Sequence, residues 1–297
     1  MAGDRGMRRT AADRASGAAP AIGTSFIRGT ATVMSIQPLS AFRDTGVDHI
    51  VSLGTACETA YNLRRHYGFA TAYPFDWWIS RTAGVARLIR DGAAADLYRA
   101  EDLEAWNGGA AIRNARYDLR LHHEFPRDWR APGQPVTADW MAHVAAPRQR
   151  TERLTRRLFG LGETARSIVF VRMAGPADSA QSDIAALLDA LQHRFAAVPI
   201  GMVFVNLRGP APADWPVERV AVTRGGDWRG DPMAWDAALA SLGLRLTPGL
   251  HRPLGAQDLR VQAAATLMPE EESAIDPPRR SVADHSHLPG RPLSIGG

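Results

Sequence analysis

The chain has 297 residues, of which 45% are hydrophobic and 22% charged, and its formal net charge is +4 at pH 7. This composition is typical of a globular protein with a sizeable core. The single cysteine excludes an intramolecular disulfide, and no apolar run approaches the roughly 18 residues of a membrane span. The arginines are spread along the chain, a distribution that does not indicate nucleic-acid binding, and no signal-peptide core is present, so we expect a cytoplasmic protein.

The two ends of the chain differ in composition from its middle. Residues 1–45 are rich in Ala, Gly, Arg, Ser and Thr without a sustained period, and we predict a disordered leader. Residues 266–297 carry Glu, Pro and Gly clusters and include His285 and His287, which could hold a metal only if this tail were ordered. We therefore predict one α/β domain over residues 46–265, and we expect no metal.

The clearest strand-to-helix transition surrounds the only cysteine, Cys57. A short apolar run over residues 50–53 stops at Gly54, and helical spacing then continues to Gly68. Thr55 and Glu58 have the spacing of a capping box, which predicts Thr55 as the N-cap and Cys57 in the first helical turn. A thiol in that position is easily ionised, although Glu58 opposes this and burial as a small apolar residue is the common alternative.

The segment after this helix gathers large aromatic side chains around one carboxylate, Asp76. Pro74 imposes an extended or turn conformation on Tyr73, and Trp77 and Trp78 then need burial. We interpret Asp76 either as the orienting group of a site or as a structural acceptor of backbone N–H bonds. A helix over residues 82–90 follows.

Residues 117–125 alternate strictly between apolar and polar, which predicts a strand. The phase places His123 on the apolar face and His122 toward water. An inward histidine is either a satisfied structural residue or, with a thiol in reach, a base. Adjacent strand residues face opposite ways, so the two histidines are not expected to share a metal.

A basic helix over residues 147–159 carries five arginines, which form either a solvated face or an anion site. Buried-strand runs follow at residues 167–172, 200–206 and 219–223, and the first two are separated by an amphipathic helix over residues 183–195. A last helix is predicted over residues 232–242. This alternation indicates a mostly parallel, helix-covered, Rossmann-like sheet.

In such sheets ligands bind at the carboxyl ends of the strands, where Arg172, Asn206 and Arg224 are predicted to lie near Cys57. These three residues are candidates for substrate or anion binding. The chain has neither a dinucleotide fingerprint nor a P-loop, so we expect no cofactor.

Three motifs together resemble a bacterial family of unknown function that is described as papain-like cysteine peptidases. They are Ser-Leu-Gly-x-x-Cys ending at Cys57, Pro-Phe-Asp-Trp ending at Trp77, and His-Glu-Phe beginning at His123. The resemblance covers roughly residues 48–240 and implies Cys57 as the nucleophile and His123 as the base, with Glu124 in place of the family's Asp. The third member is either Asp76 or Asn206. Papain-like folds contain an antiparallel sheet, whereas the strand pattern here favours a parallel one.

Three functions are consistent with these observations. The first is a thiol hydrolase or acyl-transfer enzyme that uses Cys57 and His123 on a small-molecule, peptide or glycan substrate. The second is a transferase in surface-polysaccharide metabolism, with a phosphate-bearing donor at the strand ends. The third is a non-catalytic binding domain in which Cys57 and His123 are core residues.

Overall fold

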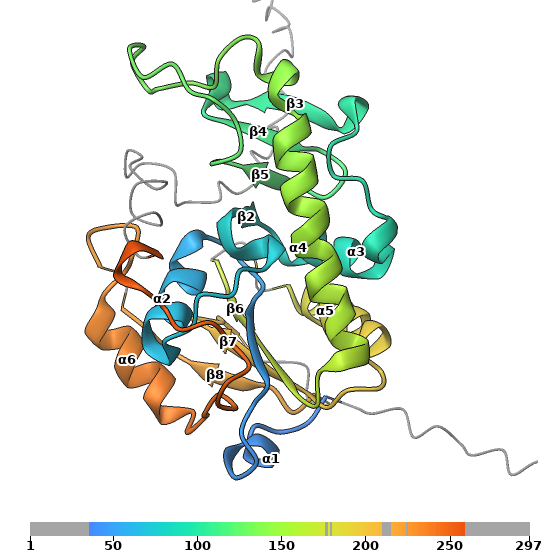
Figure 1. Ribbon diagram of the computed structural model, residues 1–297, viewed down its shortest axis with the longest axis vertical. Helices are drawn as coiled ribbons and strands as arrows, with labels where there is room; N and C mark the ends of the chain where they lie inside the picture. The colour runs from blue at the N-terminus through green and yellow to red at the C-terminus, as the bar shows by residue number, and fades with distance from the viewer. Residues whose placement is uncertain (1–35, 176–177, 179, 210–214, 224, 259–297) are drawn as a thin grey trace, which may run out of the picture. The chain divides into compact units, whose positions relative to one another are not determined.

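The computed structural model of the protein describes residues 36–175, 178, 180–209, 215–223 and 225–258 (Figure 1). Its central element is a parallel sheet with the strand order β1-β6-β7-β8. The strands are β1 (His49–Ser52), β6 (Ile168–Met173), β7 (Ile200–Val205) and β8 (Glu218–Val220). In the register, Val51 lies opposite Phe170, and Phe170 lies opposite Met202. The parallel sheet expected from the buried runs is confirmed.

Helices cover both faces of this sheet. Successive side chains of a strand point to opposite faces, so apolar strands give the sheet two apolar faces to bury. On β6, Phe170 belongs to one apolar cluster and Val169 to another. The helices that contribute buried residues to the first cluster are α3 (Thr82–Asp91), α4 (Ala145–Thr164) and α5 (Gln181–Arg194). Those that contribute to the second are α1 (Ser40–Arg43), α2 (Cys57–Tyr67) and α6 (Pro232–Ser241). Covering on both faces explains why the strands are continuously apolar.

A second, antiparallel sheet lies in the connection between β1 and β6, and its strand order is β2-β5-β4-β3. Its strands are β2 (Ile79–Ser80), β3 (Leu103–Trp106), β4 (Ala111–Asn114) and β5 (Leu119–Leu121). Short 3-10 helices connect the elements: η1 (Pro74–Trp77), η2 (Gly92–Ala94), η3 (Ala100–Asp102), η4 (Asn107–Gly109) and η5 (Trp140–His143). The fold is therefore mixed α/β, and the expectation of a mostly parallel sheet is correct for only one of two sheets.

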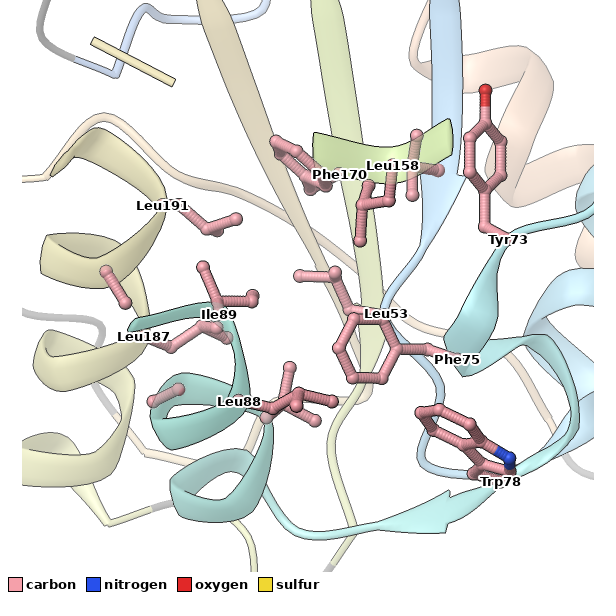
Figure 2. Close-up of a cluster of buried hydrophobic side chains, with 14 of the residues drawn as sticks. Leu53, Tyr73, Phe75, Trp78, Leu88, Ile89, Leu158, Phe170, Leu187 and Leu191 are labelled. Atoms are coloured by element: carbon pink, nitrogen blue, oxygen red, sulfur yellow. The ribbon is translucent and has the colours of Figure 1, made fainter. Parts of the chain in front are cut away.

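The larger apolar cluster joins the two sheets. Leu119 and Leu121 of β5 belong to the same cluster as Phe170 of β6. Figure 2 shows Phe75 and Trp78 facing Leu53 and the helices α3 and α5, so η1 also packs on this core. The site described below is thus supported by side chains from both sheets.

Residues 36–45 correct one predicted boundary. Their composition predicts a disordered leader, but they contain α1, and both Leu39 and Phe42 are buried against the parallel sheet. Residues 1–35 and 266–297, with His285 and His287, lie outside the described residues. No helix in the described part of the chain has the length and apolar character that a membrane span requires.

Candidate functional site

Cys57 is the first residue of α2, directly beyond the carboxyl end of β1. The chain turns between these elements through Gly54 and Thr55, which have φ values of 77° and 89°. A Cβ on Gly54 would lie 2.9 Å from the carbonyl oxygen of Phe75, so only glycine fits at this first position of the turn. The predicted placement of Cys57 in the first helical turn is confirmed.

The capping box that suggested this placement does not form. The N-cap is Ala56, whose side chain makes no cap bond. The hydroxyl of Thr55 donates instead to the carbonyl oxygen of Met173, on the neighbouring strand. Glu58 is buried and accepts a hydrogen bond of 2.9 Å from Nε1 of Trp235 on α6. Both side chains have long-range partners, which a local sequence pattern does not reveal.

The thiol of Cys57 is partly exposed at its surface and otherwise enclosed by protein. Burial is the largest effect on the group and raises its pKa from 9.0 to about 12, and the charge of Glu58 acts in the same direction. The backbone N–H groups of Cys57 and Glu58 at the helix start favour the thiolate and lower the pKa, but by less than burial raises it. Burial and Glu58 thus oppose ionisation of this thiol more strongly than the helix start favours it, the reverse of what its position in the first turn alone predicts.

The two adjacent histidines are exposed in the opposite sense to the prediction. Strand β5 ends at Leu121, and both histidines lie in the turn that follows. His122 is only 8% exposed and its pKa is lowered to about 3, chiefly by burial. His123 is partly exposed, and its ring contacts Trp77 edge-to-face at 6.2 Å between centroids. His123, unlike His122, is thus open to solvent from one side.

Arg127 accounts for the early end of the strand. Its guanidinium donates to the carbonyl oxygens of His122 and Ala110 at 2.8 and 2.7 Å. The ladder between β4 and β5 ends at the pair Ile112–Leu121, and both carbonyls lie just beyond it. The side chain of Arg127 therefore replaces the next backbone hydrogen bonds of the ladder. Alternation in the sequence does not show where such a replacement occurs.

Glu124 anchors the turn that carries the histidines, a role that the sequence did not reveal. Its carboxylate accepts hydrogen bonds from Nε1 of Trp78 at 3.1 Å and from the hydroxyl of Tyr98 at 3.2 Å. Arg150 of α4 pairs with it at 2.7 Å, although the side chain of Glu124 is only 3% exposed. The backbone beside His123 is therefore fixed by α4 and by two segments outside the helices, those of Trp78 and Tyr98.

Strand β2 lies between the segments that lead to Cys57 and to His123. Ile79 pairs on one side with Thr55 in a parallel bridge and on the other with Arg120 in an antiparallel ladder. The two segments are therefore about two strand spacings apart, ~9.5 Å between backbones. From Thr55 to Cys57 the chain runs parallel to β2, whereas from Arg120 to His123 it runs antiparallel to β2. The strand register therefore does not bring Cys57 and His123 together.

Asp76 is buried at the end of η1 and accepts hydrogen bonds from two groups. The backbone N–H of Tyr73 donates to it at 2.8 Å, and Arg64 of α2 forms an ion pair with it. Burial raises the pKa of the carboxyl group, and the charge of Arg64 opposes that rise. The guanidinium of Arg64 also lies over the ring of Trp77 at 5.6 Å. Asp76 thus contacts the surroundings of His123 through Arg64 and Trp77.

Arg172 lies at the carboxyl end of β6, as expected, but its guanidinium is fully buried among protein acceptors. It donates to the carbonyl oxygens of Leu53 and Ser80, at 2.8 and 2.9 Å, and forms an ion pair of 2.5 Å with Asp178. It thereby ties together the residue after β1, strand β2 and the loop after β6. An anion at this place would have to displace these partners.

Asn206 likewise has protein partners. Its side-chain amide donates to the carbonyl oxygen of Val222 at 3.0 Å and accepts from the N–H of the same residue at 2.8 Å. Arg224 lies outside the described residues. Among the residues that are described, no three His, Cys, Asp or Glu side chains gather as a potential metal site.

The fold and this site define a mixed α/β protein with one cysteine at a strand-to-helix turn and a histidine turn beside the neighbouring sheet. Residues 48–209, more than half of the chain, match the model of the family described as "Putative papain-like cysteine peptidase (DUF1796)". The chain belongs to this family. No curated protein and no solved structure matches the chain.

Proposed function

We propose that the protein is a thiol hydrolase or acyl-transfer enzyme in which Cys57 is the nucleophile and His123 the base. The observation that carries the proposal is the setting of Cys57. It begins a helix at the carboxyl end of a parallel strand, and the backbone N–H groups of Cys57 and Glu58 at the helix start favour a negative charge on its sulfur. The same N–H groups are suited to an oxyanion during attack on a carbonyl. Family membership supports this reading.

The raised pKa of Cys57 determines how the reaction would start. With a pKa of about 12 the thiol is protonated near neutral pH, so the base takes the proton as the sulfur attacks. A sulfur–carbon bond forms at the carbonyl, and the proton passes to a ring nitrogen of His123 and then to the departing amine or alcohol. Water then hydrolyses the thioester, which releases the acid and restores the thiol.

Asp76 fits a positioning role in this mechanism. Its carboxylate holds Arg64, the guanidinium of Arg64 covers Trp77, and Trp77 contacts the ring of His123. A change at Asp76 would therefore affect the orientation of His123 rather than remove a proton acceptor.

Alkylation of the single cysteine tests the pairing, because mass spectrometry of the intact protein reports on Cys57 alone. We expect iodoacetamide to modify the folded wild type with an apparent pKa above ~8.5, and His123→Ala to slow the modification at pH 7 several-fold. His122→Ala changes the neighbouring histidine and is the matched control, with an unchanged rate. Equal rates in wild type and His123→Ala, or modification only in denaturant, would remove the proposed pair.

Two observations favour a second candidate function, that of a non-catalytic binding domain. They are the raised pKa of Cys57 and the position of β2 between the segments of Cys57 and His123. Such a domain would show no acylated Cys57 after incubation with p-nitrophenyl acetate. The proposed hydrolase would gain one acetyl group, which Cys57→Ala would lose.

A further inference from the structure

A separate pocket of about 500 Å³ lies at the amino-terminal end of β1, whereas Cys57 follows the carboxyl end of that strand. Its walls come from β1, the segment before η1, α4 and the segment after α6. The residues that line it are His49, Ala70, Thr71, Ala72, Tyr73, Arg157, Leu161, Leu250, His251 and Arg252. The volume is in the range of small-molecule sites.

One wall of the pocket is a fixed pair of histidines. Nε2 of His251 donates to the carbonyl oxygen of Asp48 at 2.7 Å, and Nδ1 lies 2.9 Å from the hydroxyl of Thr71. The ring of His49 meets that of His251 edge-to-face at 4.9 Å between centroids. Both rings are thus held in place before any ligand binds.

Tyr73 adds a hydroxyl to this wall. Its oxygen lies 2.9 Å from Nδ1 of His49, while its ring belongs to the large apolar cluster. Figure 2 shows the hydroxyl at the end of the ring that points away from Phe75 and Trp78. Burial lowers the pKa of His49 to about 4, so the tyrosine–histidine pair is uncharged at neutral pH. This end of the pocket suits a neutral hydrogen-bonding group.

The charged side of the pocket has one positive charge in excess. Arg252 is paired with Asp258 through two bonds of 2.9 and 2.6 Å. Arg157 donates one N–H to the carbonyl oxygen of Ala72 at 2.8 Å, which positions the guanidinium and leaves further donors of its fork. The described residues that line the pocket include no carboxylate. Arg157 therefore matches one negative charge.

Leu161 and Leu250 provide an apolar surface beside these polar groups. Leu250 lines the pocket and is 48% exposed, one of few large apolar side chains in the described residues with such exposure. An apolar ligand body over Leu250 would remove that surface from water.

We propose that this pocket binds a small organic monocarboxylate. Its carboxylate pairs with Arg157, its apolar body covers Leu161 and Leu250, and a hydroxyl at the far end bonds the Tyr73–His49 pair. A phosphate dianion is a poorer match, since Arg252 already has a carboxylate partner. The proposal does not depend on the chemistry proposed for Cys57.

Calorimetric titration with 4-hydroxybenzoate tests the proposal. We expect saturable binding to the full-length wild type and to Cys57→Ala, and a Kd at least about tenfold higher for Arg157→Gln, the size of one charge-assisted pair. Arg153→Gln removes an exposed arginine one turn away on α4 and is the control, with a wild-type Kd. Tyr73→Phe weakens the binding of 4-hydroxybenzoate but not of benzoate.

Two further probes decide the ligand class. The neutral methyl ester of 4-hydroxybenzoate should bind far more weakly than the acid, and phenyl phosphate no more tightly than benzoate. Binding of the acid should also shift the imidazole nitrogen signals of His49 and His251 in NMR spectra. No binding of either carboxylate at 10 mM, equal affinity in Arg157→Gln, or tighter binding of the phosphate would overturn the proposal.

Discussion

Arg172 is the residue on which the junction of the two sheets depends most directly. Its guanidinium is fully buried, and its donors reach Leu53 directly after β1, Ser80 of β2 and Thr82 at the start of α3. Within the described part of the chain its carboxylate partner is Asp178, which is itself 2% exposed. Removal of the arginine would therefore leave a buried carboxylate without its counter-charge.

We expect Arg172→Ala to lower the free energy of unfolding by about 3–5 kcal/mol, the usual cost of breaking a buried ion pair from one side. Urea denaturation measures this loss. Arg153→Ala, which changes an exposed arginine on α4, should stay within ~0.5 kcal/mol of the wild type. A loss below about 1 kcal/mol for Arg172→Ala would show that the junction does not depend on this pair.

Residue positions were easier to predict than residue environments. The sequence placed Cys57 in the first turn of a helix and Arg172 at a strand end, because both follow from local apolar patterns. It assigned wrong environments to Thr55 and the two histidines. Their surroundings are set by Met173 and Arg127, which lie far away in sequence or beyond the strand.

At the scale of elements, α3 packs so closely on the turn between β4 and β5 that no side chain fits at Gly84. A Cβ added there would lie 1.8 Å from the carbonyl oxygen of Tyr117. Gly160 lies inside α4, and a Cβ added to it would meet no atom within 4 Å. Alanine at these two positions therefore separates two effects on stability. At Gly84 it tests the close packing of α3 on the turn, and at Gly160 it tests the cost of a flexible glycine inside a helix.

We expect Gly84→Ala to destabilise the protein by more than about 2 kcal/mol, because the helix must move away from the turn. Gly160→Ala should stabilise it by about 0.5–1 kcal/mol, since alanine favours a helix where space is open. Thermal and urea unfolding of both variants give the comparison. A neutral Gly84→Ala would contradict the close packing of α3 on this turn.

The antiparallel sheet shows why some elements escaped prediction. Strand β2 has two residues, and β3 exposes Glu104, which pairs across the strands with Arg113 at 2.9 Å. Such strands have neither the length nor the apolar pattern of β6 and β7 and are recognised only through their partners. The parallel sheet was predictable because each of its longer strands is apolar throughout.

At the scale of the whole molecule, one apolar cluster links both sheets. Protonation of a histidine buried beside this cluster should therefore destabilise the whole folded unit and not one sheet alone. His122 lies next to this cluster, in the turn after β5. Burial, then the charges of His123, Arg127 and Arg120, lower its pKa from 6.5 to about 3. The pKa of His49, on β1, is lowered to about 4, chiefly by burial.

These two shifts predict how global stability depends on pH. Between pH 6.5 and about 4 the unfolded chain binds protons at both histidines, whereas the folded protein does not. The stability they contribute is therefore complete above pH 6.5 and is lost as the pH falls. For His122 alone we expect about 1–2 kcal/mol between pH 7 and pH 5. The lowered pKa of Asp48, about 2, acts only at more acidic pH.

Urea denaturation of the wild type and of His122→Gln at pH 7 and pH 5 isolates this contribution, because other titrating groups are common to both proteins. We expect the variant to lose about 1–2 kcal/mol less than the wild type over this interval, whatever its stability at pH 7. His143→Gln changes an exposed histidine and should keep the pH dependence of the wild type. If His122→Gln kept it as well, His122 would be able to take up a proton in the folded state, and its burial beside the core would not control the acid sensitivity of the fold.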